Sequence, residues 1–164
     1  MDAAPAETST LPQHAARPIT GNAPARVRVP EAWHDQAVDI ARRAASAHRL
    51  GPPNEDGTTL GPVISERQFD AIQRMIAIGI DEGAQLACGG LGRPEHLPKG
   101  YYVQPTIFAA VSQNMTIARE DIFGPVLVIQ AYEDEADAVR MANDSVFGLA
   151  AYVQSGDPER ARAI

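Results

Sequence analysis

Residues 119–132 contain the feature that most constrains the fold: a Gly-Pro pair between an acidic-aromatic segment and a long apolar run. Proline cannot continue a helix and it restricts the residue before it, so Gly124-Pro125 ends any helix that arrives from Met115–Glu120. The run that follows, Val126–Tyr132, is rich in β-branched residues and indicates a buried strand. The chain must therefore turn sharply at this point and enter a strand.

Two carboxylates and one aromatic ring lie immediately before this corner, in Glu120, Asp121 and Phe123. The mouth of a buried strand is a usual place for α/β proteins to bind ligands, which makes these residues a candidate site. The same pattern also fits a solvated helix end, a core ring and a turn that bind nothing. The pattern alone leaves both interpretations open.

Composition excludes several classes of protein. A net charge of −7 argues against nucleic acid or an anionic membrane as a partner, and no apolar run has the length of a membrane span. The first four residues carry neither the basic nor the apolar region of a secretory signal. The single cysteine, Cys88, excludes a disulfide framework and fits a reducing compartment, so a cytoplasmic location is expected.

The chain divides into two parts of different character. Residues 1–25 are rich in Ala, Pro, Ser and Thr with little periodicity, which predicts a disordered or linker-like segment. Residues 26–164 alternate strand and helix patterns and therefore predict an α/β fold with one core. The expected strands are Arg26–Val29, Gln85–Cys88, part of Tyr102–Phe108, Val126–Tyr132 and Gly148–Gln154, and the expected helices start after Pro30 and Ser65, near Ser112 and Asp134, and at Pro158.

Three of these helix boundaries have local signals. Ser65 with Gln68 three residues later is a capping box, Gly83 suits a left-handed helix end, and Asp157 before Pro158 suits a helix start. The helix at Pro158 has barely two turns before residue 164, and a helix of that length is marginal in water. The chain therefore resembles an excerpt from a larger domain.

Other candidate sites are weak. Cys88 has apolar and glycine flanks and no nearby histidine, so an inert buried thiol is favoured over a nucleophile. The acidic loop at residues 51–62 lacks the ligand spacing of a calcium loop, so no metal site is expected.

Five segments, taken in order and spacing, resemble the NAD(P)-dependent aldehyde dehydrogenase superfamily. The resemblance covers residues 26–164 and implies a partial aldehyde dehydrogenase catalytic domain of mixed strands and helices. The matching segments are Leu60–Ser65, Gly83–Gly90, Gly100–Phe108, Met115–Val126 and Ala142–Leu149.

The resemblance implies a reaction and a cofactor site. In this family a cysteine thiolate attacks an aldehyde, hydride passes to NAD or NADP, and a water activated by a glutamate releases the carboxylic acid. Carried over, Phe123 packs near the nicotinamide, and Asp121 bonds the ribose hydroxyls where the family usually has glutamate. Because Asp121 is one methylene shorter, either a bridging water covers the gap to the ribose or Glu120 contributes as a second acid at the cofactor site.

The resemblance does not supply a catalytic residue. The nucleophile's place falls at Gly21 or its neighbours, where no cysteine is present, and the nucleotide-binding half has no counterpart in the chain. The expected function is therefore aldehyde oxidation in the intact family, with this chain alone inactive. The alternative is a truncated, non-catalytic remnant that at most binds nucleotide weakly or associates with a full-length relative. The expected partners are an aldehyde substrate and either a second copy of the chain, in a homo-oligomer, or a full-length relative.

Overall fold

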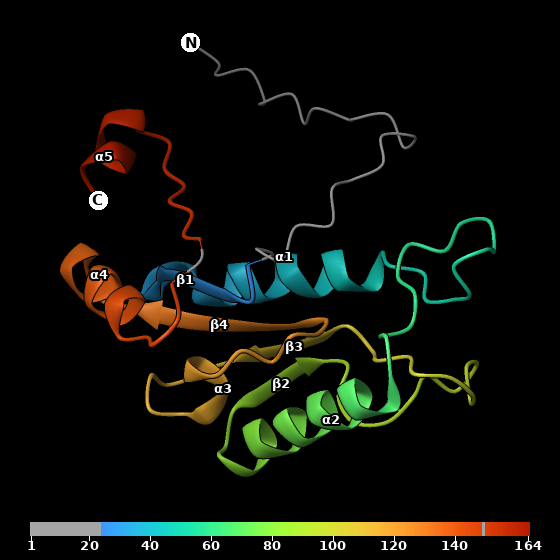
Figure 1. Ribbon diagram of the computed structural model, residues 1–164. Helices are drawn as coiled ribbons and strands as arrows, with labels where there is room; N and C mark the ends of the chain where they lie inside the picture. The colour runs from blue at the N-terminus through green and yellow to red at the C-terminus, as the bar shows by residue number, and fades with distance from the viewer. Residues whose placement is uncertain (1–23, 149) are drawn as a thin grey trace.

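The computed structural model describes residues 24–148 and 150–164 (Figure 1). Its centre is a four-stranded sheet in the order β1-β4-β3-β2. The prediction of an α/β fold is confirmed, whereas most of the predicted linker segment and position 21 lie outside the described residues. The strands are β1 (Arg26–Pro30), β2 (Gln85–Cys88), β3 (Thr106–Ala109) and β4 (Val126–Tyr132).

Strand β4 begins and ends at the predicted residues and holds the sheet together. It pairs in parallel with β1 on one side and with β3 on the other, so that Val128 lies opposite both Arg26 and Phe108. Strand β2 forms one edge of the sheet and pairs antiparallel with β3. The predicted site residues therefore precede a central strand, whose position is fixed by neighbours on both sides.

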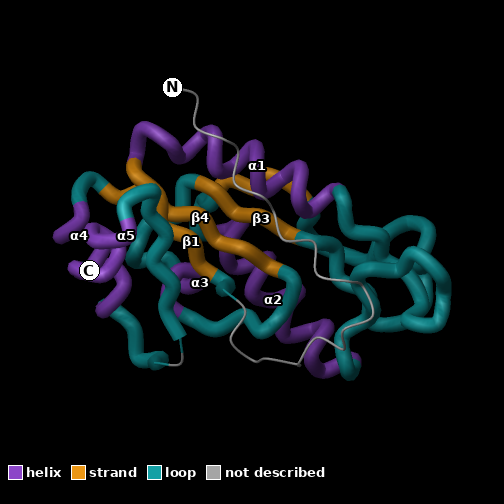
Figure 2. Tube along the Cα trace, turned by 90° about the horizontal axis from the view of Figure 1, so that it is seen from above, coloured by secondary structure: helices purple, strands orange, loops and turns teal. Residues whose placement is uncertain are grey.

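Helices cover the two faces of the sheet (Figures 1 and 2). Helix α1 (His34–Ser46), which follows a short 3-10 turn η1 (Glu31–Trp33), lies on one face. Helices α2 (Glu66–Asp81) and α3 (Thr116–Arg119) lie on the other, and α4 (Glu135–Asn143) sits beyond the end of β4. Helix α5 (Pro158–Ala163) ends the chain.

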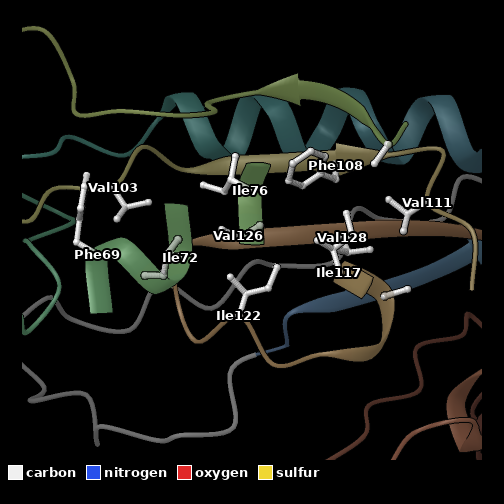
Figure 3. Packing of buried hydrophobic residues seen from close by; sticks show 12 residues of the cluster. Phe69, Ile72, Ile76, Val103, Phe108, Val111, Ile117, Ile122, Val126 and Val128 are labelled. Carbon is white, nitrogen blue, oxygen red and sulfur yellow. The ribbon is translucent and has the colours of Figure 1, made fainter. Parts of the chain in front are cut away.

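The core lies between the sheet and the helices α2 and α3 (Figure 3). The side chains of Phe108, Ile72 and Ile76 are fully enclosed there. The core cluster consists of Phe69, Ile72, Ile76, Ala84, Val103, Phe108, Val111, Ile117, Ala118, Ile122, Val126 and Val128.

Among the described residues, no helix is both long and apolar enough to cross a bilayer.

The local helix signals are confirmed. Ser65 Oγ accepts a hydrogen bond from the Gln68 amide at 3.2 Å, which is the N-cap half of the predicted capping box, whereas the Gln68 side chain donates to the Phe123 carbonyl. Gly83 has a φ of +88°, which a glycine adopts without the steric cost that other residues meet. Asp157 caps α5 by accepting from the amide of Glu159 at 2.9 Å.

One predicted strand is wrong. Residues 150–154 form no strand, and the side chains of Tyr152 and Val153 are 60% and 48% exposed. The apolar run has the composition of a buried strand, but burial depends on a neighbouring strand and a covering layer. Figure 1 shows this segment leading away from the sheet toward α5, so no described part of the chain provides either.

Candidate functional site

The segment from Glu120 to Pro125 connects the end of α3 to the start of β4. The Glu120 amide still bonds to the Thr116 carbonyl at 2.9 Å, which closes the single turn of α3. Ile122 then enters the core and is only 4% exposed, whereas Phe123 turns outward and is 68% exposed. The buried isoleucine therefore anchors a loop that presents an aromatic ring to solvent.

Phe123 has an unusual backbone conformation. Its φ is +52°, in the left-handed region where residues other than glycine cost of order 1–3 kcal/mol. Two side chains hold it there: Asp121 Oδ1 accepts from the Phe123 amide at 3.1 Å, and Gln68 Nε2 donates to the Phe123 carbonyl at 2.7 Å. Strained residues are concentrated at functional sites, so the strained and exposed Phe123 makes this loop a candidate binding site.

The carboxylates of Glu120 and Asp121, beside the Phe123 ring, have oxygen atoms that accept no hydrogen bond from the described residues. Asp121 uses one oxygen to hold the loop, while Asp121 Oδ2 and the Glu120 carboxylate have no partner among the residues that the structure describes. Both side chains are exposed. The structure thus brings the three predicted site residues together on one exposed loop, with two free acceptor groups next to an aromatic surface.

Gly124 forms the corner by lying directly against the core. A Cβ built on Gly124 would lie 2.5 Å from Ile72 Cδ1 and 2.8 Å from Ile72 Cγ1, closer than real contacts allow. Ile72 is itself fully enclosed by α2 and the sheet, so it has little room to move. The loop and the core therefore constrain each other at this point.

Replacing Gly124 with alanine is expected to destabilise the fold by about 1–3 kcal/mol, the usual cost of overpacking a core. Urea unfolding followed by circular dichroism measures the change. Gly156→Ala is the matched control, because a Cβ at Gly156 would meet nothing within 4 Å. Equal stability of the two variants would contradict the close packing of Gly124 on Ile72.

Cys88 does not have the surroundings of a nucleophile. It lies half-buried on the edge strand β2, and its Sγ donates to the Pro105 carbonyl at 3.7 Å. Burial raises the pKa of the Cys88 thiol, with smaller opposing effects from a backbone hydrogen bond at Ile107 and from the charge of Arg42. The raised pKa leaves a smaller fraction of the thiol ionised than in a free cysteine, and the inert role of Cys88 stays a prediction.

The sequence model of the aldehyde dehydrogenase family matches residues 20–164, which include the whole candidate site. The chain belongs to the aldehyde dehydrogenase family. It is 46% identical, over 97% of its length, to a 3-succinoylsemialdehyde-pyridine dehydrogenase of Pseudomonas sp., and 48% identical, over 82%, to a putative aldehyde dehydrogenase of Staphylococcus aureus. It spans 35% and 28% of the length of these two relatives.

Solved structures of aldehyde dehydrogenases share the fold. The Bartonella henselae enzyme superposes with a TM-score of 0.84 at 46% identity, over 87% of this chain and 30% of that one. The C291A mutant of Pseudomonas syringae AldC, solved with NAD+ and octanal, gives 0.84 at 45% identity, over 86% of this chain and 29% of that one. The arrangement of strands and helices is therefore that of about a third of an aldehyde dehydrogenase.

The three predicted site residues lie together on one loop, but the contacts that hold this loop were not predicted from the sequence. The sequence predicts Gln68 only as part of a capping box, whereas its side chain bonds to the Phe123 carbonyl 55 residues away. Aromatic residues rarely adopt a left-handed φ, so the residue type of Phe123 did not predict its conformation. An acidic residue two positions before it was the available hint, since aspartate commonly bonds to the amide two residues on.

Proposed function

We propose that this chain forms the nicotinamide-ribose side of the cofactor site in an NAD(P)-dependent aldehyde dehydrogenase, which oxidises an aldehyde to a carboxylic acid. The observation that carries the proposal is the strained, outward-facing Phe123 beside two free acidic acceptors. Relatives with the same fold support it, because solved structures from Pseudomonas syringae and Mycobacterium tuberculosis contain NAD+.

The residues present fit such a cofactor. Ribose hydroxyls are hydrogen-bond donors, and Asp121 Oδ2 and the Glu120 carboxylate are acceptors without a described partner. The exposed ring of Phe123 gives a planar base an apolar surface on which to pack. In this proposal Asp121 has two roles, because its other oxygen holds the loop in shape.

The chemistry divides between the cofactor and the chain. The bound nicotinamide supplies an acceptor for hydride, and the chain's residues orient it. Asp121 and Glu120 hold the ribose, while Phe123 covers the ring and excludes water beside it. Gln68 keeps Phe123 in place through its carbonyl at 2.7 Å and so acts as a positioning residue.

A second candidate is a non-catalytic protein that binds the cofactor weakly or associates with a full-length relative. The observation that favours it is the state of Cys88, which lies on an edge strand with a raised pKa. Position 21, where the resemblance places the nucleophile, is a glycine. The two candidates share the cofactor site and differ in whether the chain oxidises an aldehyde.

Replacing Phe123 with alanine is expected to weaken NAD+ binding roughly 2- to 10-fold, the equivalent of losing one aromatic contact of about 0.5–1.5 kcal/mol. Saturation-transfer NMR on the full chain, titrated with NAD+ into the millimolar range, measures the dissociation constant. The melting temperature is expected to change little, because the ring is 68% exposed.

Trp33→Ala is the matched control, because Trp33 is also an exposed aromatic residue, at 65%, and lies in the turn before α1 on the opposite face of the sheet from α2 and α3. Its NAD+ affinity should equal that of the unchanged chain. Equal weakening in both variants, or none in Phe123→Ala, would remove Phe123 from the site.

A further inference from the structure

An ion pair holds the start of the site loop to a distant part of the chain. Arg119 is the last residue of α3 and directly precedes Glu120. Its guanidinium donates two parallel hydrogen bonds to the Asp144 carboxylate, from Nη1 to Oδ2 at 2.9 Å and from Nη2 to Oδ1 at 3.1 Å. Bidentate pairs of this kind fix direction as well as distance.

Asp144 is itself held from the sheet side. Gln113 Nε2 donates to Asp144 Oδ2 at 3.2 Å and to the Asp144 carbonyl at 3.3 Å. Gln130, fully buried on β4, donates from its own Nε2 to Gln113 Oε1 at 3.0 Å. Hydrogen bonds from Gln113 and then from Arg119 lower the pKa of Asp144, so its carboxylate stays charged near neutral pH. A chain of contacts thus runs from the central strand to Arg119.

The backbone of the same helix end is held by β1. Arg26 Nη1 donates to the Ala118 carbonyl at 3.0 Å and to the Arg119 carbonyl at 3.3 Å. Helix α3 has only four residues, too few to be stable without tertiary contacts. The direction in which the chain leaves α3 toward Glu120 is therefore set by these contacts.

We infer that the Arg119–Asp144 pair positions the Glu120–Phe123 loop for the cofactor, with Asp144 as the positioning residue. The inference rests on the proposed function of that loop. Asp144 touches none of the three site residues in any described hydrogen bond, and it acts through Arg119, which adjoins Glu120. Asp144 thereby sets the direction of the Glu120 and Asp121 carboxylates and of the Phe123 ring.

The test compares three variants of the full 164-residue chain. Asp144→Asn keeps the size of the side chain and removes its charge, and Arg119→Lys keeps the charge and removes the two-pronged grip. Asp39→Asn is the matched control, because Asp39 pairs with Arg42 at 3.1 Å within α1 and joins no other element through that pair. The measurements are hydrogen–deuterium exchange of peptides covering residues 119–124, NAD+ affinity by saturation-transfer NMR, and the melting temperature.

In Asp144→Asn, exchange of the 119–124 peptides is expected to accelerate about fivefold, as befits the loss of one partly exposed ion pair, and the NAD+ dissociation constant to rise by a similar factor. Arg119→Lys should give an intermediate value for both. The melting temperature should change little in either variant, and Asp39→Asn should match the unchanged chain throughout. A merely structural role would lower the melting temperature without this selective loss of affinity.

Two failures can be told apart. If the unchanged chain binds NAD+ and Asp144→Asn binds it equally well, the positioning role is overturned while the proposed function stands. If the unchanged chain shows no response to NAD+ in the millimolar range, the proposed function of the loop is overturned, and the inference with it.

Discussion

A chain with alanine in place of Phe108 is expected to lose about 3–5 kcal/mol of unfolding free energy, the usual cost of deleting a fully buried aromatic side chain. Phe108 has no exposed surface and lies at the centre of the core on β3. It also touches the backbone region of α2, since a Cβ on Gly79 would lie 3.1 Å from Phe108 Cζ. Domains are stable by only about 5–15 kcal/mol, so the variant is expected to be largely unfolded at moderate temperature.

Thermal and urea unfolding, followed by circular dichroism, measure this loss. Phe123→Ala is the matched control, because it deletes the same side chain from a position that is 68% exposed instead of fully buried. The control should unfold within about 1 kcal/mol of the unchanged chain. Equal destabilisation of the two variants would contradict the division between a core phenylalanine and a site phenylalanine.

Only part of the fold and of the candidate site could be predicted from the sequence. Strand β4, the capping box of α2 and the glycine end of the same helix were all found from sequence, because each depends on residues within a few positions of one another. The site loop was located for the same reason, since the acids, the ring and the Gly-Pro corner are consecutive. Local signals are therefore enough to identify this loop as a candidate site.

The contacts that shape the site could not be predicted, because they join residues far apart in the chain. Gln68 reaches Phe123 across 55 residues, and Arg119 reaches Asp144 across 25. The wrong strand at residues 148–154 has the same physical origin: an apolar pattern states what a segment prefers, whereas burial depends on a partner elsewhere. Tyr152 and Val153 are exposed because no described element covers them.

The backbone strain at Phe123 is offset by two hydrogen bonds to its backbone. The left-handed Phe123 raises the energy of the folded state, and the bonds from Asp121 and Gln68 compensate for it. Loss of either support should therefore let the residue relax to an ordinary conformation and turn the ring away. An exposed ring that needs two supports to stay exposed is consistent with a surface kept ready for a ligand.

The full chain is expected to show no NAD(P)-dependent aldehyde oxidation above the protein-free rate, whereas working enzymes commonly reach about 10 turnovers per second. The thiolate is the nucleophile in the implied reaction, and position 21, where the resemblance places it, is a glycine. We expect that Cys88 does not replace it, because burial raises its thiol pKa and its Sγ donates to the Pro105 carbonyl.

The measurement is NADH formation from octanal or another aldehyde by the purified, mass-verified chain, with Pseudomonas syringae AldC, whose C291A mutant was solved with NAD+ and octanal, as the positive control for the assay. Cys88→Ala is assayed beside it. Oxidation that survives Cys88→Ala would show a route that needs no cysteine of this chain, and oxidation abolished by it would make Cys88 the nucleophile. Either result would contradict the expectation. If the chain binds NAD+ through Phe123 but oxidises no aldehyde, it has the cofactor contacts without the catalytic thiolate.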